Sequence, residues 1–247
     1  MKQFALTLGG QDVNLPLAHH HLVQSMIYAL LRADERYSGQ LHSMGFTAGG
    51  RKFKLFTFSS LRGHKTVGAG RITFKNDVFL DIRSISDAFC DKLTTGLRRA
   101  GSLSLGANPL TLRACKTSAP VIKTSGMDIR MLSPLTVHMT EEGRTTYFTP
   151  LDAEFSRYVN QNFHNKYKAY FGHAPDGDIE LETISAGLKD KYVTRFKSTM
   201  ITAWRGTYRL SGKAEHLNFL YYTGLGAKNS AGFGMFEPVK VVEDHKP

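Results

Sequence analysis

A glycine-rich segment near the end of the chain combines residue types that suit phosphate binding. Residues 224–234 read Gly-Leu-Gly-Ala-Lys-Asn-Ser-Ala-Gly-Phe-Gly, with four glycines in eleven positions. Backbone amides can approach an anion closely in such a segment, and Lys228 would add a positive charge. The segment therefore predicts a loop of exposed backbone donors that binds phosphate. The alternative is an ordinary flexible connection between a helix and a strand.

Histidine is the next candidate for chemistry, because its side chain titrates near neutral pH and can also bind metals. Three of the 10 histidines adjoin as His19-His20-His21. Successive residues at the start of a helix point in different directions, so this tract makes a poor chelating site, and we assign it to the start of a helix. His42 stands between Leu41 and Ser43, and these neighbours do not by themselves mark it as catalytic.

Signatures of metal and cofactor chemistry are missing from the sequence. It holds no HExxH, no CxxC pair and no Gly-x-Ser-x-Gly. Cys90 and Cys115 are the only cysteines, too few for a disulfide framework or a zinc cluster. We therefore predict no metal, no cofactor and a reducing, cytoplasmic compartment. The scattered carboxylates weaken the alternative of a metal-dependent nuclease.

The charge balance favours an anionic partner. The 247 residues include 32 Lys and Arg against 21 Asp and Glu, a formal net charge of +11, and 41% are hydrophobic. Such a surplus suits nucleic acid or an anionic membrane surface, although many basic proteins are charged only for solubility. Arg195, Lys197 and Arg205 would share one face of a sheet and follow a phosphate backbone. No run approaches the ~20 apolar residues of a membrane span, and the first residues lack a secretory signal.

The first half of the chain contains the elements of a split βαβ fold. In the helix predicted over residues 18–32, apolar residues recur at helical spacing, and Tyr28 falls off that stripe. The other elements are a strand over 4–8 that ends in a break at 14–16, a β-prone run over 53–58, a hairpin of 71–74 with 78–82 turned at Asn76-Asp77, a helix from its N-cap Ser84 with Asp87 to Leu97, and a strand over 110–116.

The second half repeats this order of elements. They are an alternating run over 129–139, a turn at Gly143, a helix from Thr149-Pro150-Leu151-Asp152 to Phe171, a loop over 174–178, a stretch over 191–210 that pairs with itself around Arg205-Gly206, a helix over 213–222 and a strand over 233–242. We therefore predict an α+β fold of two tandem ferredoxin-like (RRM-like, βαββαβ) domains, 1–120 and 121–247, the second with a C-terminal glycine-rich loop.

Four stretches together resemble one protein family. They are Ser25-Met26-Ile27-Tyr28, then Leu41-His42 followed by Lys54-Leu55-Phe56-Thr57-Phe58-Ser59, then Leu132-Ser133-Pro134-Leu135 with Lys166-Tyr167, and finally residues 224–235. The last stretch closely resembles the glycine-rich signature of the CRISPR-associated endoribonucleases of the Cas-six family, in the RAMP superfamily. Members of that family cut repeat RNA to mature guide RNAs, and the resemblance spans nearly the whole chain.

The resemblance implies a set of catalytic residues. His42 occupies the position of the usual catalytic histidine, Tyr28 matches a helix tyrosine, and Lys54 matches the lysine directly before Leu-Phe-Thr. The segment between His42 and Lys54 is longer than in compact relatives, so Lys52 is a rival for the lysine's role.

Cleavage by these residues would need no metal. The 2′-OH attacks the adjacent phosphorus and leaves a 2′,3′-cyclic phosphate and a 5′-OH. His42 would act as general acid or base, and Lys54 would stabilise the charge of the transition state. Tyr28 would transfer the second proton or position the 2′-OH, since a phenol is otherwise a poor base.

The same resemblance implies repeat RNA, or pre-crRNA, as the partner. The residues expected to contact it are Lys52, Arg98, Arg99, Lys123, Arg195 and Lys197, and in the loop Gly224, Gly226, Lys228, Asn229, Ser230, Gly232 and Gly234. An alternative is an RNA-binding subunit of a CRISPR effector complex that holds RNA without cutting it. The sequence predicts no membrane partner, and it leaves open a homodimer and association with effector-complex proteins.

Overall fold

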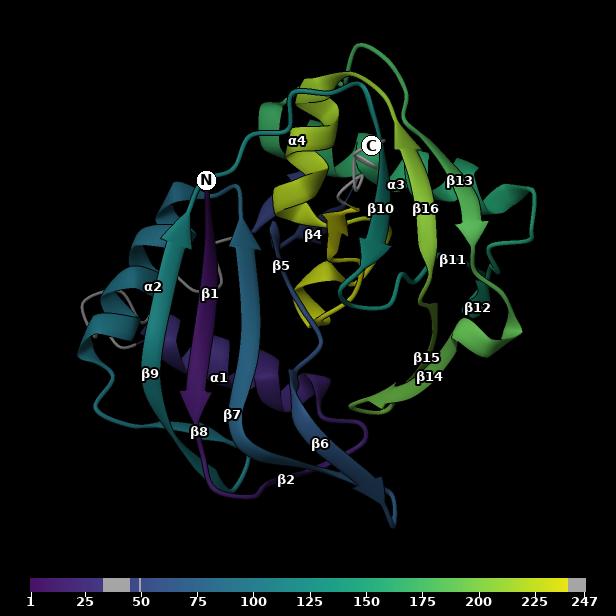
Figure 1. Ribbon diagram of the computed structural model, residues 1–247. Coiled ribbons are helices and arrows are strands. Elements are labelled where there is room, and N and C mark those ends of the chain that lie inside the picture. Colours follow the sequence, from purple (N-terminus) through teal and green to yellow (C-terminus); the bar gives the residue numbers. More distant parts are fainter. Residues whose placement is uncertain (33–44, 49, 240–247) are drawn as a thin grey trace, which may run out of the picture.

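One long strand, β7, organises the first half of the protein. The computed structural model describes residues 1–32, 45–48 and 50–239 (Figure 1). In this half the sheet strands are β1 (Lys2–Gly9), β2 (Val13–Pro16), β5 (Phe56–Phe58), β6 (Arg62–Gly68), β7 (Arg71–Ser84), β8 (Leu103–Leu105) and β9 (Asn108–Ser118), with helices α1 (His20–Arg32) and α2 (Asp87–Arg99). β7 pairs with β1 and β2 along one edge and with β5 and β6 along the other, while β9 lies beyond β1. The antiparallel order β9–β1–β7–β5, with helices after β1 and β7, is ferredoxin-like.

The second half builds a smaller sheet with the same order. Its elements are β10 (Gly126–Met131), α3 (Glu154–Phe171), β13 (Glu180–Ser185), β16 (Thr207–Ser211), α4 (Ala214–Thr223) and β17 (Phe236–Pro238). β10 and β16 are central, β13 pairs with β16, and β17 pairs with β10. Because α3 follows β10 and α4 follows β16, this half is also ferredoxin-like. The chain is thus an α+β protein with two ferredoxin-like units, as the sequence predicts.

Among the described residues, three two-stranded hairpins lie outside these sheets. They are β3 (Phe46–Ala48) with β4 (Arg51–Phe53), β11 (His138–Glu141) with β12 (Arg144–Tyr147), and β14 (Lys191–Phe196) with β15 (Thr199–Trp204). β4 and β11 both border the cleft described below. Along the part of the chain that the structure describes, no helix is long and apolar enough to cross a membrane.

The apolar stripes predicted for the helices form the cores. In α1, Val23, Ile27 and Leu30 are buried among sheet residues that include Phe4 and Leu6. Burial of one helix stripe against one sheet face is what fixes the helix on the sheet, because removing apolar surface from water is the main stabilising effect.

Buried contacts also join the two halves. Leu55 and Ile85, from the first half, lie in the second hydrophobic core. Arg83 of β7 donates a hydrogen bond to the Phe236 carbonyl at 2.5 Å and stacks on Tyr221, with its guanidinium carbon 3.7 Å from the ring centroid. The yellow glycine-rich segment runs between the two sheets (Figure 1).

The predicted hairpin at Asn76-Asp77 is wrong, because β7 continues through both residues. Asn76 does have a positive φ of 61°, but a two-residue hairpin turn of the common type needs this at both positions. Neighbours occupy both edges of β7 here, with Asp77 opposite Gly9 of β1 and Lys75 opposite His64 of β6. Pairing on both sides keeps the chain extended. Residues 14–16, predicted as a break, fall within β2.

Two predicted helix starts are displaced. Ser84 does not cap α2, because its hydroxyl donates to the Leu55 carbonyl at 2.7 Å; the cap is Ser86, whose hydroxyl oxygen accepts from the Phe89 amide at 3.3 Å. Helix α3 begins at Glu154 rather than at 149. The Asp152 carboxylate instead accepts a hydrogen bond from the Thr149 amide at 2.7 Å, so residues 149–152 form a turn before the helix.

Two predictions for the last third of the chain are also wrong. The stretch over 191–210 turns at Lys197, where φ is 54°, and not at Arg205-Gly206. Gly206 instead precedes β16, which leaves the hairpin to join the second sheet. The final strand is only Phe236–Pro238, because Phe233 lies in the glycine-rich loop; residues 240–247 are outside the described part.

Candidate functional site

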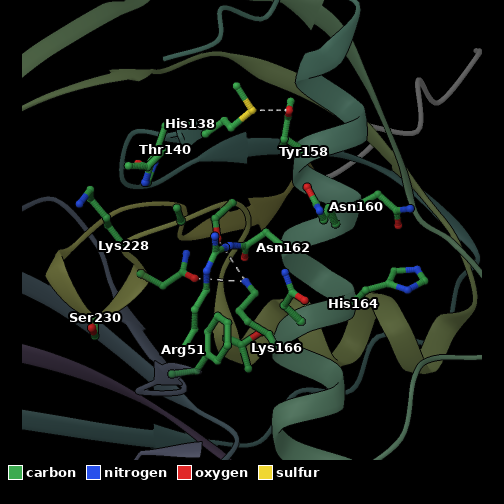
Figure 2. A pocket seen from close by; sticks show the side chains of 18 of the residues that line it. Arg51, His138, Thr140, Tyr158, Asn160, Asn162, His164, Lys166, Lys228 and Ser230 are labelled. Carbon is green, nitrogen blue, oxygen red and sulfur yellow. Dashed lines mark hydrogen bonds between the residues drawn. The ribbon is translucent and has the colours of Figure 1, made fainter. Parts of the chain in front are cut away.

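A cleft of about 920 Å³ opens between the two halves of the protein. Its walls come from β4, β11, α3 and the glycine-rich loop (Figure 2). The cationic residues that line it are Arg51, Lys52, Lys54, Arg157, Lys166 and Lys228. Glu141 is the one acidic residue among its described lining residues. A concave surface with this charge balance attracts a polyanion.

Tyr28 and Lys54 meet where this cleft adjoins a smaller cavity. Lys54 lies between β4 and β5 and lines both spaces, and Tyr28 lines the smaller one. The Lys54 ammonium donates a hydrogen bond to the Tyr28 hydroxyl at 2.8 Å and lies 4.6 Å from the ring centroid. Tyr28 can occupy this place because it falls off the buried stripe of α1, as the sequence indicates.

Lys52 has a different environment from Lys54. It is exposed on β4, opposite Thr47 of β3, and its side chain lies against Gly45. It lines the cleft, but the lysine in contact with Tyr28 is Lys54. His42 lies outside the described residues, so its catalytic role stays a prediction.

The glycine-rich loop is largely buried, which corrects the expectation of exposed backbone donors. Six of its amides donate to carbonyls: Gly224 to Leu220 at 2.7 Å, Leu225 to Gly234 at 2.8 Å, Ala227 to Thr136 at 3.0 Å, Ala231 to Lys228 at 2.9 Å, Gly232 to Asn229 at 2.9 Å and Gly234 to Pro134 at 2.9 Å. These donors hold the loop in place and are not directed at an anion. The glycines Gly224, Gly226, Gly232 and Gly234 are all buried.

Two of these glycines show why the loop needs this residue type. Gly226 has φ 59°, and a Cβ there would lie 2.6 Å from the Thr136 carbonyl oxygen. Gly234 has φ 77°, and a Cβ there would overlap the Leu225 carbonyl oxygen. Residues with a Cβ are disfavoured at such φ values even with open space. Here the glycines permit close packing of backbone on backbone.

Lys166 of α3 forms hydrogen bonds with the glycine-rich loop. Its ammonium donates to the Gly224 carbonyl at 2.5 Å and to the Asn229 side-chain oxygen at 3.1 Å. Asn229 in turn donates to the Leu225 carbonyl at 2.8 Å and the Phe233 carbonyl at 3.0 Å. Burial lowers the pKa of Lys166 from 10.5 to about 7. The sequence offered a signal for it, a lysine on the buried stripe of α3.

The loop also contacts the first half of the chain. Gln24 donates to the Ser230 carbonyl at 2.6 Å, and a ring nitrogen of His20 lies 3.3 Å from the Ala231 carbonyl. His20 stacks on Phe233, with 4.8 Å between centroids. Burial lowers the pKa of His20 to about 4, helped by the nearby His19. The histidine tract therefore starts α1, as predicted, and its middle member packs between the two halves.

Only part of the predicted RNA surface borders the cleft. The side chains of Lys228 and Ser230 line it, as do Lys52, Gly226 and Asn229. Burial lowers the pKa of Lys228. The predicted contacts that do not line it are Gly224, Gly232 and Gly234 of the loop, Arg98 and Arg99 at the end of α2, Lys123 before β10, and Arg195 and Lys197 on the β14–β15 hairpin.

The predicted basic face of the 191–210 stretch does not form as expected. Lys197 lies in the turn, and the Arg205 guanidinium carbon lies 4.8 Å from the Tyr192 ring centroid. Tyr192 and Arg195 differ by three positions on one strand and point to opposite faces. Arg195 and Arg205 therefore do not share a face.

One group of side chains in the described part has metal-ligand composition. Ligand atoms of Asp176, Glu215 and His216 lie within 4.8 Å of one another. Lys213 already forms an ion pair with Asp176 and supplies a positive charge there. This group is not among the residues that line the cleft.

Comparisons with known families cover both halves of the chain. Residues 14–116 match the family described as "CRISPR-associated protein Cas6, N-terminal", and residues 117–238 match "CRISPR associated protein Cas6, C-terminal".

Curated proteins and solved structures give the same relationship. The chain is 29% identical over 233 residues to "CRISPR-associated endoribonuclease Cas6 1" of Methanocaldococcus jannaschii, covering 90% of this chain and 86% of that protein. It is 25% identical over 226 residues to "CRISPR-associated endoribonuclease Cas6" of Pyrococcus furiosus, covering 90% and 82%. A solved "CRISPR associated protein Cas6" superposes with a TM-score of 0.80 at 25% identity, covering 97% of this chain and 99% of that one.

Proposed function

The chain belongs to the Cas6 family of CRISPR-associated proteins, and we propose that it is an endoribonuclease that cuts CRISPR repeat RNA into mature guide RNAs. Its curated relatives are named as CRISPR-associated endoribonucleases. The observation that carries the proposal is the Lys54–Tyr28 pair beside a cationic cleft. A cleft of that charge holds a phosphate backbone, and the pair supplies polar groups for the reaction.

The proposed reaction is an attack by the ribose 2′-oxygen on the adjacent phosphorus. The O2′–P bond forms and the P–O5′ bond breaks. One group accepts the 2′-OH proton, and another protonates the departing 5′-oxygen. The products are a 2′,3′-cyclic phosphate and a 5′-OH, so the atoms balance without water or metal.

Each proposed catalytic residue has one task. Lys54 places a positive charge beside the phosphate, where it stabilises the extra negative charge of the transition state. The Tyr28 oxygen accepts a hydrogen bond from Lys54, so its own O–H is available to donate to a substrate oxygen. His42 performs a proton transfer as general acid or base, because imidazole titrates near neutral pH.

We further propose that the two ferredoxin-like units are domains 1–120 and 121–247, with the RNA held between them. Arg51 belongs to the first domain, and Arg157 and Lys228 belong to the second, yet all three line one cleft. Phosphate contacts from both sides would fix the register of the strand.

The test is cleavage of the host's repeat RNA in excess EDTA, by wild type and by His42→Ala. We expect cutting that survives EDTA and is lost in the variant, with a 2′-deoxy nucleotide at the cut site also blocking cleavage. Loss of cutting in EDTA would refute the metal-free mechanism. Tight binding without cutting by wild type would identify an RNA-holding subunit of an effector complex instead.

A further inference from the structure

A buried serine contacts the backbone that carries Lys54. Ser84 lies at the end of β7, and its hydroxyl donates a hydrogen bond to the carbonyl of Leu55, the residue after Lys54, at 2.7 Å. The same hydroxyl oxygen accepts a hydrogen bond from the Ser86 amide at 3.1 Å. Ser84, Lys54 and Tyr28 all line the smaller cavity. Ser84 is therefore next to the Lys54–Tyr28 pair, and its bonds are made inside the protein.

The two residues after Lys54 are anchored in different hydrophobic cores. Leu55 is buried in the core of the second half, whereas Phe56 is buried in the core of the first half. The Phe56 amide donates to the Lys54 carbonyl at 2.7 Å, which closes a three-residue turn centred on Leu55. Phe56 then pairs with Ser84 across β5 and β7. The Ser84 hydroxyl thus ties the carbonyl at the centre of this turn to β7.

The Lys54 side chain depends on its backbone for its position. It is exposed, and its ammonium donates to the Tyr28 hydroxyl at 2.8 Å. A lysine ammonium is carried on a flexible four-carbon stem, so a shift of the Lys54 backbone changes the positions that the ammonium can reach. A displacement of about 1 Å at a reacting group can slow a reaction by about 100-fold. A group that fixes this backbone therefore affects the reaction without touching the substrate.

We propose that Ser84 is a positioning residue for Lys54: its bond to the Leu55 carbonyl holds the Lys54 backbone where the ammonium meets both Tyr28 and the scissile phosphate. The proposal rests on the proposed function, because it takes Lys54 as the group that stabilises the transition state. Ser84 is buried and is not among the described residues that line the large cleft, so it acts through Lys54 and not on the RNA.

The test measures coupling between Ser84 and Lys54. Full-length wild type, Ser84→Ala, Lys54→Ala and the double variant cleave the host's repeat RNA in single turnovers over a range of protein concentrations. We expect Ser84→Ala to lower the rate constant at saturating protein about tenfold and to change the half-saturating protein concentration less than about twofold. Added to Lys54→Ala, the same substitution should lower the rate constant less than about twofold, because the group that Ser84 positions is gone.

Ser86→Ala is the matched control for a loss of stability. Ser86 lines the same small cavity, and its hydroxyl oxygen accepts a hydrogen bond from the Phe89 amide at 3.3 Å as the cap of α2. Its replacement removes one hydrogen bond of the first half but keeps the bond between Ser84 and Leu55. We expect Ser86→Ala to lower the melting temperature about as much as Ser84→Ala, and to change the rate constant less than about twofold.

The outcomes separate this inference from the proposed function. If wild type cuts the repeat and Ser84→Ala cuts it equally fast, the positioning role is refuted and the endoribonuclease stands. The same holds if Ser84→Ala slows Lys54→Ala as much as it slows wild type, or if Ser86→Ala slows cleavage as much as Ser84→Ala does, because the loss then reflects stability alone. If wild type does not cut repeat RNA, the proposed function fails and this inference fails with it.

Discussion

The glycine-rich loop and the other parts of the cleft wall use polar groups in different ways. In the loop, Asn229 bonds to Lys166 and to two carbonyls, and most backbone amides have a partner. Elsewhere in the wall, Asn162 and His138 each have a buried atom without a hydrogen-bond partner among the described residues, and Lys54 is exposed. The loop is thus packed as tightly as a protein core, mainly through backbone contacts. The other parts of the wall present polar and charged side chains to the cleft. The difference shows that a composition typical of phosphate binding can instead serve close packing of the backbone.

The largest effect on activity is expected from Lys54→Ala. Removing a group that stabilises the transition-state charge should lower the cleavage rate about 10²–10³-fold, while the midpoint of urea unfolding stays unchanged because Lys54 is exposed. The measurement is single-turnover cleavage of repeat RNA. Lys52→Ala is the control, since Lys52 does not contact Tyr28, and it should lower the rate less than about tenfold. The reverse ranking of the two lysines would assign the role to Lys52.

Gly234→Ala should have the largest effect on stability. The added Cβ would overlap the Leu225 carbonyl at a positive φ, so the free energy of unfolding should fall by roughly 2–4 kcal/mol. Urea denaturation followed by circular dichroism measures the loss. Gly143→Ala provides a control at a similar φ of 77° where a Cβ meets nothing within 4 Å. Equal losses would show that φ alone, and not the packing of the loop, explains the glycine.

Lys166 makes the stability of the glycine-rich loop depend on pH above neutrality. Its pKa falls to about 7 in the folded protein from an ordinary 10.5, so between these values the unfolded chain binds the extra proton. The free energy of unfolding should therefore rise as the pH is raised from about 7 toward 10.5. Lys166→Met should flatten this rise and should lower stability at pH 8 by about 2 kcal/mol, because the Gly224 carbonyl and Asn229 lose their donor. The measurement is urea denaturation of wild type and variant across that pH range. If the free energy of unfolding rises with pH as steeply in Lys166→Met as in wild type, the lowered pKa of Lys166 is contradicted.

The smallest effect is expected outside the cleft. Arg195→Ala should weaken binding of uncleavable repeat RNA less than about twofold, whereas Arg51→Ala should weaken it about tenfold and reduce the dependence of log affinity on log salt by about one. Fluorescence titrations at several salt concentrations measure the RNA affinity of both variants and of wild type. A large effect of Arg195 would extend the RNA surface to the β14–β15 hairpin and remove the contrast between cleft and surroundings.

Local patterns were sufficient for most elements of the fold. The stripe of α1, the buried Phe155, Val159 and Phe163 of α3, and the strand over 4–8 are where the sequence predicts them. The errors occur where pairing with neighbouring strands determines the local structure. Asn76-Asp77 has turn composition, but strands on both sides of β7 keep it extended.

The residues of the candidate site also fall into those that the sequence indicates and those that it does not. The sequence distinguishes Tyr28 because it falls off an apolar stripe, and Lys54 because it matches a lysine of the family; the structure brings the two together. The sequence does not indicate Arg51, His138 or Asn162 as cleft residues, since nothing in their immediate sequence distinguishes them from ordinary surface residues.

The sequence by itself determined the two ferredoxin-like units, the family, the excess of positive charge and the place of the glycine-rich segment along the chain. These follow from periodicity, composition and motif, which involve residues close together in sequence. Only the tertiary structure decided that the segment is buried and that Lys166 holds it. Lys166 is 58 positions from Gly224, and burial of a polar group depends on what packs around it, which local sequence does not contain. The same reason applies to the cleft, whose charge is determined by the sequence and whose unpaired atoms are determined by the fold.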